Sequence, residues 1–181
     1  MLFTFEPIDE SHFSLLLKWL ESPFIKVWWD PEITWTHKLI EEKYGTYVKG
    51  YKKIILAGKV IERPISAFII LLNSHKIGYI QYYDFYDFPR EYSQVISGLP
   101  ANLAAIDMFL GEKNLMGKGI GPALLEQFLK EYVFKKFDAV FVDPESANKN
   151  AIRAYEKAGF VRFKQIQNGN ITCMIRAKEG G

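Results

Sequence analysis

The sequence contains few of the residues that build metal cages, cross-links or membrane spans. Its 181 residues include one cysteine, Cys173, which excludes an internal disulfide and any cysteine-based metal cage. The three histidines (His12, His37 and His75) are too far apart to form a metal-ligand pattern, so we expect no metal. The longest apolar run, residues 65–72, is much shorter than the roughly 20 residues that cross a bilayer.

Neither positive nor negative charge is in large excess, with 23 Lys and Arg residues and 21 Asp and Glu residues. The net charge of +2 is too small to indicate nucleic acid or an anionic membrane as a partner, so we expect neither. The first ten residues, MLFTFEPIDE, contain acids where a secretion signal needs a basic start, which favours a cytoplasmic protein. Hydrophobic residues make up 49%, aromatic residues 15% and charged residues 24% of the chain, as in a folded globular protein. We expect one domain over residues 1–181.

Hydrophobic periodicity and turn residues predict strands and helices that alternate along the chain. Strands are predicted over residues 2–7, 65–72, 77–84, 104–110, 139–142, 161–166 and 171–176. Helices are predicted over residues 11–21, 36–48, 122–134 and 148–158. Residues 24–35 read as irregular, residues 85–102 as a long, mixed loop or helix, and residues 49–62 are hard to assign. This order indicates an α/β fold in which helices cover a mixed sheet.

A glycine-rich stretch, LGEKNLMGKGIGPALL, joins the predicted strand at 104–110 to the helix at 122–134. It fits neither the P-loop pattern nor the dinucleotide fingerprint G-x-G-x-x-G, and what remains is G-x-G-x-G at Gly117, Gly119 and Gly121. Bare backbone amides just before a helix favour an anion such as a diphosphate. The alternative is a glycine-rich turn that binds nothing.

Two stretches together point to a known family. MGKGIGPALL, followed by VDPESANKNAIRAYEKAGF, resembles the acetyl-CoA-binding core of the GCN5-related N-acetyltransferases (GNAT), over about residues 65–176. The resemblance implies an α/β GNAT fold: a mixed, mostly antiparallel twisted sheet, helices on both faces, and a V-shaped splay between the fourth and fifth strands. It also implies acetyl-CoA as cosubstrate, no metal, and direct transfer of the acetyl group in a ternary complex.

The resemblance assigns a cofactor-binding role to the glycine loop and the last helix. The loop amides of Gly117 to Gly121 would hold the coenzyme A diphosphate, Asn148 would contact the pantetheine arm, and Tyr155 would lie next to the thioester sulfur. Met116 departs from the pattern, because the family usually has Gln or Arg there. The full expected set is Met108, Phe109, Leu110, Leu115, Met116, Gly117, Lys118, Gly119, Ile120, Gly121, Pro122, Asn148, Ala151, Tyr155 and Lys157.

Within the superfamily, the sequence looks most like the aminoglycoside 6′-N-acetyltransferases, which confer antibiotic resistance. The stretches IKVWWDPE and AAIDMFLGEKNLMGKGIG support this likeness. It implies that Asp107 acts toward the amine, that Asp143 lines the drug pocket, and that Trp28 and Trp29 lie near the sugar. The full expected substrate set is Trp28, Trp29, Asp30, Tyr79, Gln81, Asp84, Asp107 and Asp143. The substrate would be a polycationic small-molecule amine, and the enzyme a monomer or homodimer.

The chemistry of acetyl transfer suits two of these residues. Asp107 is a lone acid in the apolar strand AAIDMFL, where an unpaired carboxylate is costly, so we assign it a catalytic role. It could take the amine proton itself, or hold the cationic amine while water takes the proton. Tyr155 could protonate the departing thiolate, since phenol and thiol pKa values are close. The alternatives are a structural carboxylate and a packing tyrosine.

Charge near the predicted site is acidic. Between Ile77 and Gly111 there are four acids (Asp84, Asp87, Glu91 and Asp107) and one base, Arg90, which favours a cationic substrate unless the segment is an ordinary solvated loop. Other readings stay open: an acetyltransferase for another amine or hydroxylamine, such as a siderophore precursor, a polyamine or a peptide N-terminus, or a non-catalytic acyl-CoA-binding sensor.

Overall fold

The computed structural model of the protein describes residues 1–180. The chain divides into two compact units. The first unit comprises Met1–Gln81 and Met108–Leu115, and the second comprises Tyr82–Asp107 and the chain from Met116 onward. The expectation of one domain over the whole chain stays a prediction.

The strands form one mixed seven-stranded sheet and one small sheet. The large sheet has the order β1-β4-β5-β6-β7-β9-β8, and β2 pairs with β3 alone. Within residues 1–180 the strands are β1 (Phe3–Pro7), β2 (Tyr51–Leu56), β3 (Lys59–Pro64), β4 (Ser66–Leu72), β5 (His75–Asp84), β6 (Leu103–Leu110), β7 (Ala139–Val142), β8 (Val161–Ile166) and β9 (Ile171–Ala177). The helices in the same residues are α1 (Phe13–Leu20), α2 (Pro23–Lys26), α3 (His37–Val48), α4 (Ile120–Glu131) and α5 (Lys149–Lys157). Short 3-10 turns are η1 (Glu10–His12), η2 (Phe85–Asp87), η3 (Ser93–Val95), η4 (Lys113–Leu115) and η5 (Val133–Lys135).

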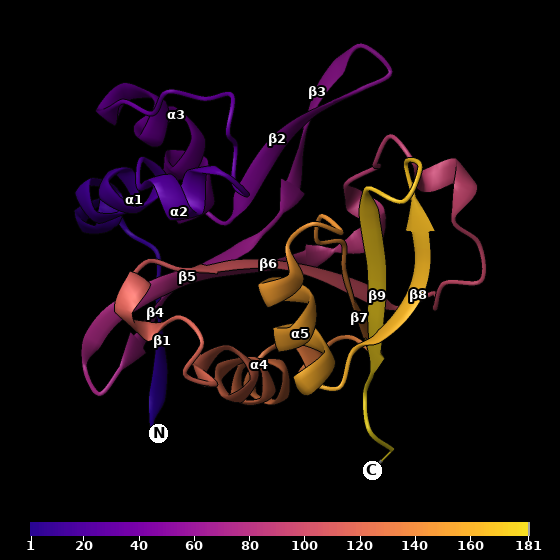
Figure 1. Cartoon of the computed structure of the whole chain (residues 1–181). Helices are drawn as coiled ribbons and strands as arrows, with labels where there is room; N and C mark the ends of the chain where they lie inside the picture. The colour runs from indigo at the N-terminus through magenta and orange to yellow at the C-terminus, as the bar shows by residue number, and fades with distance from the viewer. Residues whose placement is uncertain (181) are drawn as a thin grey trace. The chain divides into compact units, whose positions relative to one another are not determined.

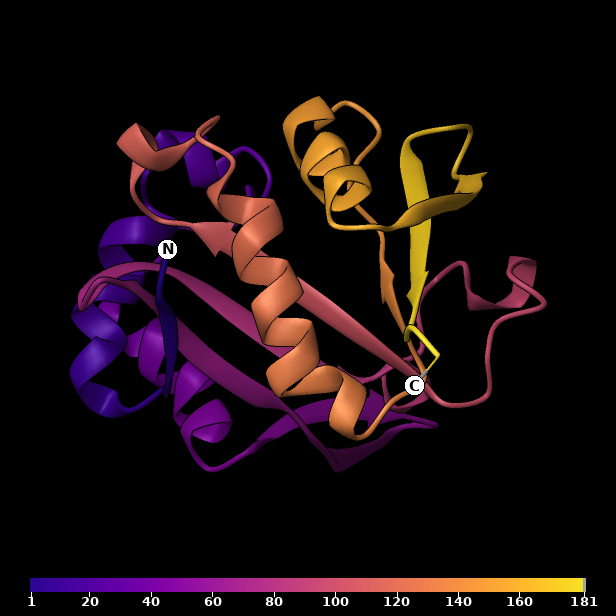
Figure 2. The same cartoon turned by 90° about the horizontal axis from the view of Figure 1, so that it is seen from below.

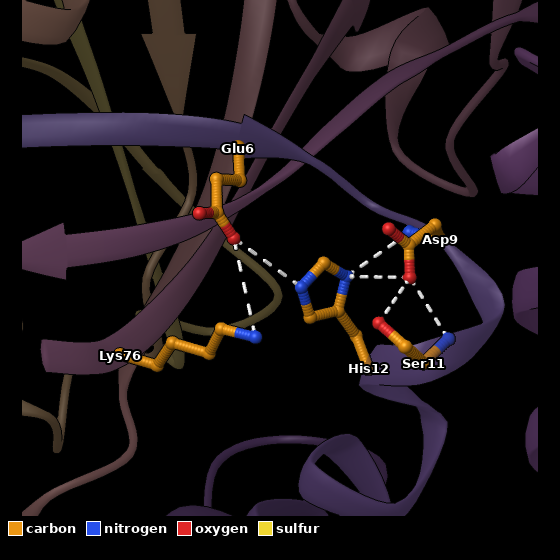
Figure 3. Close-up of polar contacts among 5 residues, drawn as sticks. All are labelled: Glu6, Asp9, Ser11, His12 and Lys76. Atoms are coloured by element: carbon orange, nitrogen blue, oxygen red, sulfur yellow. Dashed lines mark hydrogen bonds and ion pairs between the residues drawn. The ribbon is translucent and has the colours of Figure 1, made fainter. Parts of the chain in front are cut away.

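In the first unit, a buried histidine joins the end of β1 to the start of α1. Figure 3 shows His12 between Glu6 and Asp9. His12 Nδ1 accepts the backbone N–H of Asp9 at 3.0 Å, and Nε2 lies 3.4 Å from Glu6 Oε2. The Asp9 carboxylate accepts the backbone N–H of Ser11 at 2.8 Å, and Lys76 Nζ lies 4.0 Å from Glu6 Oε2. These bonds form a capping box that satisfies amides at the start of the helical segment.

Residues 49–62, which give no pattern in the sequence, contain most of a two-stranded hairpin. β2 and β3 pair antiparallel from Tyr51↔Pro64 to Leu56↔Lys59 (Figure 1). The turn between them is made by Ala57 and Gly58, both with positive φ (50° and 74°), as in the tight turns that match strand twist. Many side chains on both strands are exposed or half-buried, so no apolar face alternates with a polar one.

In the second unit, the parallel pair β6–β7 sits where the splay is predicted. These are the fourth and fifth strands in the sheet order, and they pair over three residues only, from Leu103↔Ala139 to Ala105↔Phe141. β7 then pairs antiparallel with β9, and β9 with β8 (Figure 1). Because the β6–β7 ladder ends early, the residues of β6 just beyond it are not paired to β7.

The two helices of the second unit start and stop close to the predicted residues. α4 begins at Ile120, two residues before the prediction, because Gly119 has a left-handed conformation that ends the loop there. Pro122 is therefore the third helical residue, still within the first turn that lacks intrahelical amide partners. α5 begins after Asn148 and is followed by Gly159, whose φ is +83°. α4 packs on the sheet (Figure 2), where Phe128 meets the ring of Tyr82 edge to face at 5.9 Å.

Two exclusions drawn from the sequence can be compared with the described residues. None of the helices in residues 1–180 is long and apolar enough to cross a membrane. Within the same part of the chain, no group of three or more His, Cys, Asp and Glu side chains could hold a metal ion.

Candidate active site

Asp107 lies on β6, two residues beyond the last residue that pairs with β7. Its side chain is half-buried, and Asp107 Oδ2 accepts a hydrogen bond from the Tyr83 hydroxyl at 3.0 Å. Burial raises the pKa of Tyr83 well above its ordinary value, and the negative charge of Asp107 raises it further. Tyr83 is therefore a neutral hydrogen-bond donor to the carboxylate at all physiological pH values.

Asp143, the residue just after β7, forms an ion pair with an arginine from the loop between β5 and β6. Arg90 Nε lies 3.1 Å from Asp143 Oδ2, and the Tyr92 hydroxyl donates to the same oxygen. Arg90 Nη2 also donates to the Tyr83 hydroxyl at 3.0 Å. One connected chain of hydrogen bonds thus joins Asp143 to Asp107 through Arg90 and Tyr83.

Tyr155 lies on α5 and is buried. Its ring packs edge to face on Phe160, with centroids 5.2 Å apart. Burial raises the pKa of the Tyr155 hydroxyl above its ordinary value, and the charges of Asp107 and Asp143 add to the shift. The Tyr155 hydroxyl is therefore neutral at physiological pH and can act as a hydrogen-bond donor.

The glycine loop has the geometry of an anion site. Gly117 and Gly119 have positive φ (74° and 72°), and a Cβ added at either position meets no atom within 4 Å. No side chain caps the start of α4, so its first amides are not used by the protein's own side chains. At Gly121 an added Cβ would lie 3.6 Å from the Ala154 side chain on α5, in ordinary contact. The loop residues present therefore fit a diphosphate group.

Two of the predicted site residues also have structural roles. Asn148 caps α5, because its side-chain oxygen accepts the backbone N–H of Ala151 at 3.2 Å. Asp84 caps the turn η2, where its carboxylate accepts the backbone N–H of Tyr86 at 2.9 Å. These bonds explain the two residues without any ligand, and their binding roles stay predictions.

In the first unit, several predicted residues form an aromatic cluster. The Trp29 ring meets Phe109 edge to face at 5.0 Å and Tyr79 at 6.1 Å, and Tyr79 stacks on Phe109 at 5.6 Å. The fully buried Tyr79 donates its hydroxyl proton to Gln81 Oε1 at 2.6 Å. Asp30 is bound to Lys43 at 3.0 Å, so its charge is already paired.

The predicted residues are divided between the two units. The first unit holds Trp28, Trp29, Asp30, Tyr79, Gln81, Met108, Phe109, Leu110 and Leu115. The second holds Asp84, Asp107, Met116, Gly117, Lys118, Gly119, Ile120, Gly121, Pro122, Asp143, Asn148, Ala151, Tyr155 and Lys157. In the second unit, Met116, Lys118 and Lys157 are exposed.

Sequence reasoning missed Tyr83 and Arg90, which join the two acids, and Tyr92, which donates to Asp143. Arg90 entered only as the single base in an acidic segment. Two signals were present: Tyr83 follows Gln81 at the strand period of two, and a lone arginine among acids is a natural ion-pair partner.

Cys173 is poorly suited to act as a nucleophile. Its side chain is buried in β9, and burial followed by the charge of Asp143 raises its pKa to about 11. Native protein at pH 8 should therefore react with iodoacetamide roughly a hundredfold more slowly than protein unfolded in urea, because thiolate is the reactive form. The native rate should rise with pH up to about 11. Mass spectrometry of timed samples measures both rates, and equal rates at pH 8 contradict the assignment.

The comparison that decides the family is with models of protein families. The model described as an acetyltransferase (GNAT) domain matches residues 9–168. The chain belongs to this family. The predicted superfamily, its α/β fold and N-acetyltransferase activity are confirmed.

This GNAT-family chain is similar to proteins named for aminoglycosides. Aminoglycoside N(6′)-acetyltransferase type 1 of Klebsiella pneumoniae is 28% identical over 188 aligned positions, which cover 97% of this chain and 83% of the relative. The kanamycin resistance protein of Rhizobium radiobacter is 33% identical over 78 positions, covering 41% of this chain and 71% of the relative. The solved structure of AAC(6′)-Ib in complex with coenzyme A and kanamycin has a TM-score of 0.79 at 23% identity, covering 98% of this chain and 96% of that one.

Proposed function

We propose that this protein transfers the acetyl group of acetyl-CoA to a primary amine of a small molecule, most specifically the 6′-amino group of an aminoglycoside antibiotic in the cytoplasm. The observation that supports it best is that the second unit contains both a carboxylate and a buried phenol suited to amine acetylation. A carboxylate, Asp107, lies just beyond the point where β6 leaves β7, and a phenol, Tyr155, has its pKa raised by burial and then by the charges of Asp107 and Asp143. An acid that attracts an ammonium and a neutral proton donor are the two groups that amine acetylation needs.

The transfer would proceed directly in a ternary complex. Asp107 holds the incoming ammonium, and its proton is lost to the carboxylate or to water. The neutral nitrogen then attacks the thioester carbonyl carbon, the C–S bond breaks, and the amide forms. The departing thiolate takes the proton of Tyr155, and the proton that the nitrogen loses as the amide forms returns to Tyr155 through solvent. No residue becomes acetylated, in keeping with the buried, protonated state of Cys173.

The coenzyme A diphosphate would be held by the glycine loop from Gly117 to Gly121, with Lys118 able to add a positive charge. The loop amides and the uncapped start of α4 support this assignment. Asn148 uses its side-chain oxygen to cap α5, so it would contact the pantetheine arm through its amide N–H₂. Met116 supplies no charge, and the backbone amides would do most of the binding.

Replacing Gly119 with Ala should weaken acetyl-CoA binding about tenfold. The left-handed φ of +72° costs a residue with a Cβ roughly 1–2 kcal/mol, and the loop would relax away from the binding conformation. Isothermal titration gives the dissociation constant. Gly169→Ala is the matched control, because Gly169 has a similar φ of +83° but lies in the β8–β9 turn. The same dissociation constant in both variants would count against the loop as the diphosphate site.

The aminoglycoside assignment draws on the names of similar proteins, since two relatives are aminoglycoside 6′-acetyltransferases and one similar solved structure contains kanamycin. A polycationic amine also suits the acidic segment between β5 and β6. Trp28 and Trp29 would contact the sugar ring, as the resemblance implies.

A second candidate is an amine with fewer positive charges, such as a hydroxylamine or a siderophore precursor. Arg90 is largely buried and paired with Asp143 at 3.1 Å, so one of the two site acids is already neutralised by the protein. A second ammonium beside Arg90 would be repelled, by about 4 kcal/mol at 4 Å in an effective dielectric of about 20.

The experiment is thiol release from acetyl-CoA with a panel of amines: kanamycin, tobramycin, spermidine, N6-hydroxylysine and a short peptide. An aminoglycoside with a hydroxyl at the 6′ position is the regiochemical control. Turnover of the 6′-amino drugs alone supports the leading proposal. Turnover of hydroxylysine alone moves the assignment to the second candidate, and turnover of spermidine alone would indicate a polyamine acetyltransferase. Acetyl-CoA binding without turnover of any amine would leave an acyl-CoA-binding sensor.

A further inference from the structure

The direction of the hydrogen bonds between Arg90 and Asp107 is determined by the atoms present. A guanidinium has only donors, so Arg90 Nη2 donates to the Tyr83 oxygen at 3.0 Å. A hydroxyl has one proton, and the Tyr83 oxygen is already an acceptor from Arg90. Its proton is therefore directed to Asp107 Oδ2, at 3.0 Å. Arg90 therefore donates to Tyr83, and Tyr83 donates to Asp107.

Arg90 itself is held in place from several sides. Its Nε pairs with Asp143 Oδ2 at 3.1 Å, and the Tyr92 hydroxyl donates to that same oxygen. The guanidinium carbon lies 4.8 Å from the ring centre of Phe85 and 5.3 Å from that of Phe141, in cation–π contact. Its side chain is 13% exposed. The Arg90 guanidinium is held by the ion pair with Asp143 and by two buried rings, so it has little freedom to turn away from Tyr83.

We propose that Tyr83 and Arg90 are positioning residues for the acetyl transfer: Arg90 orients the Tyr83 hydroxyl, and Tyr83 holds the Asp107 carboxylate in the orientation that receives the amine. This inference rests on the proposed function. The charged and titratable groups that face Asp107 in the second unit are Tyr83 on β5, Arg90 in the following loop, Asp143 after β7 and Tyr155 on α5. Tyr83 is in direct hydrogen-bond contact with Asp107, and Arg90 acts through Tyr83.

The first test is a double-mutant cycle in the steady-state kinetics. Tyr83→Phe should lower kcat about tenfold and leave the KM for acetyl-CoA unchanged, because the carboxylate loses its orientation but the cofactor loop is untouched. Arg90→Gln should lower kcat by a similar factor. The double variant should be no slower than Tyr83→Phe alone, since Arg90 acts through the missing hydroxyl. Additive losses, or a full-speed Tyr83→Phe, would overturn the proposal.

Tyr86→Phe is the matched control for the lost hydroxyl. Tyr86 is exposed, follows Tyr83 in the chain by three residues, and donates its hydroxyl proton to the carbonyl of Pro100 at 2.6 Å instead of to an acid. It should turn over at the wild-type rate. Thermal unfolding of every variant separates lost orientation from lost folding, and Tyr83→Phe retains the half-buried aromatic ring.

The second test does not need turnover. Carbon-13 NMR of labelled aspartates, with Asp107→Asn to assign the signal, follows the ionisation of Asp107 directly. Tyr83→Phe should move its midpoint to higher pH, because a hydrogen bond that favours the charged form is gone. Tyr86→Phe should not move it. An unchanged midpoint in Tyr83→Phe refutes the holding role even in an active enzyme. A shifted midpoint in a protein that acetylates no amine refutes the proposed function instead.

Discussion

Asp107→Asn should lower kcat about a thousandfold toward any amine that the wild-type enzyme acetylates, within the range lost when a general base is removed. The amide keeps the size of the carboxylate and can still accept the Tyr83 hydroxyl proton, so folding should be little affected. It lacks the negative charge that holds an ammonium and the basicity that removes its proton. The steady-state rate of thiol release measures the effect.

Binding and folding controls accompany this variant. The dissociation constant for acetyl-CoA should match that of the wild type, because the glycine loop is unchanged. Asp138→Asn is the matched charge control, since Asp138 is an exposed acid just before β7 that accepts a hydrogen bond from Asn102. It should retain the wild-type rate. A loss of less than about tenfold in Asp107→Asn would show that Asp107 is a structural carboxylate, the alternative left open by the sequence.

Gly111→Ala should destabilise the protein by about 3 kcal/mol or more, at or above the upper end of what overpacking a core costs. Gly111 follows β6, and its backbone N–H donates to Ile77 O at 2.7 Å. A Cβ there would lie 2.2 Å from Trp19 Cε2, closer than any real contact. Trp19 is fully buried, its Nε1–H donates to Glu112 at 3.0 Å, and its ring cannot swing aside without losing that bond.

Thermal unfolding measures this loss, which corresponds to a drop in Tm of roughly 6–12 °C for a chain of this size. Gly45→Ala is the matched control of opposite sign. Gly45 lies inside α3, and an added Cβ meets no atom within 4 Å. It should stabilise the protein by roughly 0.5–1 kcal/mol through helix propensity. Equal Tm values for the two variants would contradict the packing argument.

Local patterns sufficed wherever one face of an element is buried. β7 has the predicted bounds, Ala139–Val142, because four consecutive apolar residues between polar ones allow only a short buried strand. Asn73, in the turn between β4 and β5, and Gly159, after α5, adopt the positive φ that their residue types favour. The β2–β3 hairpin was missed because much of both its faces contacts solvent. Its sequence therefore lacks the alternation of apolar and polar residues that predicts a strand.

By itself the sequence determined the family, the order of most elements and the position of the glycine loop, because these depend on residues within one short stretch. It also singled out Asp107, an acid in an apolar strand. Only the tertiary structure decided what surrounds that acid. Tyr83 lies 24 residues from Asp107 in the chain, and Arg90 lies 53 residues from Asp143. Folding the strands into one sheet brings such distant groups within hydrogen-bond distance. Burial then strengthens the electrostatic interaction between them, because the protein interior has a lower dielectric constant than water.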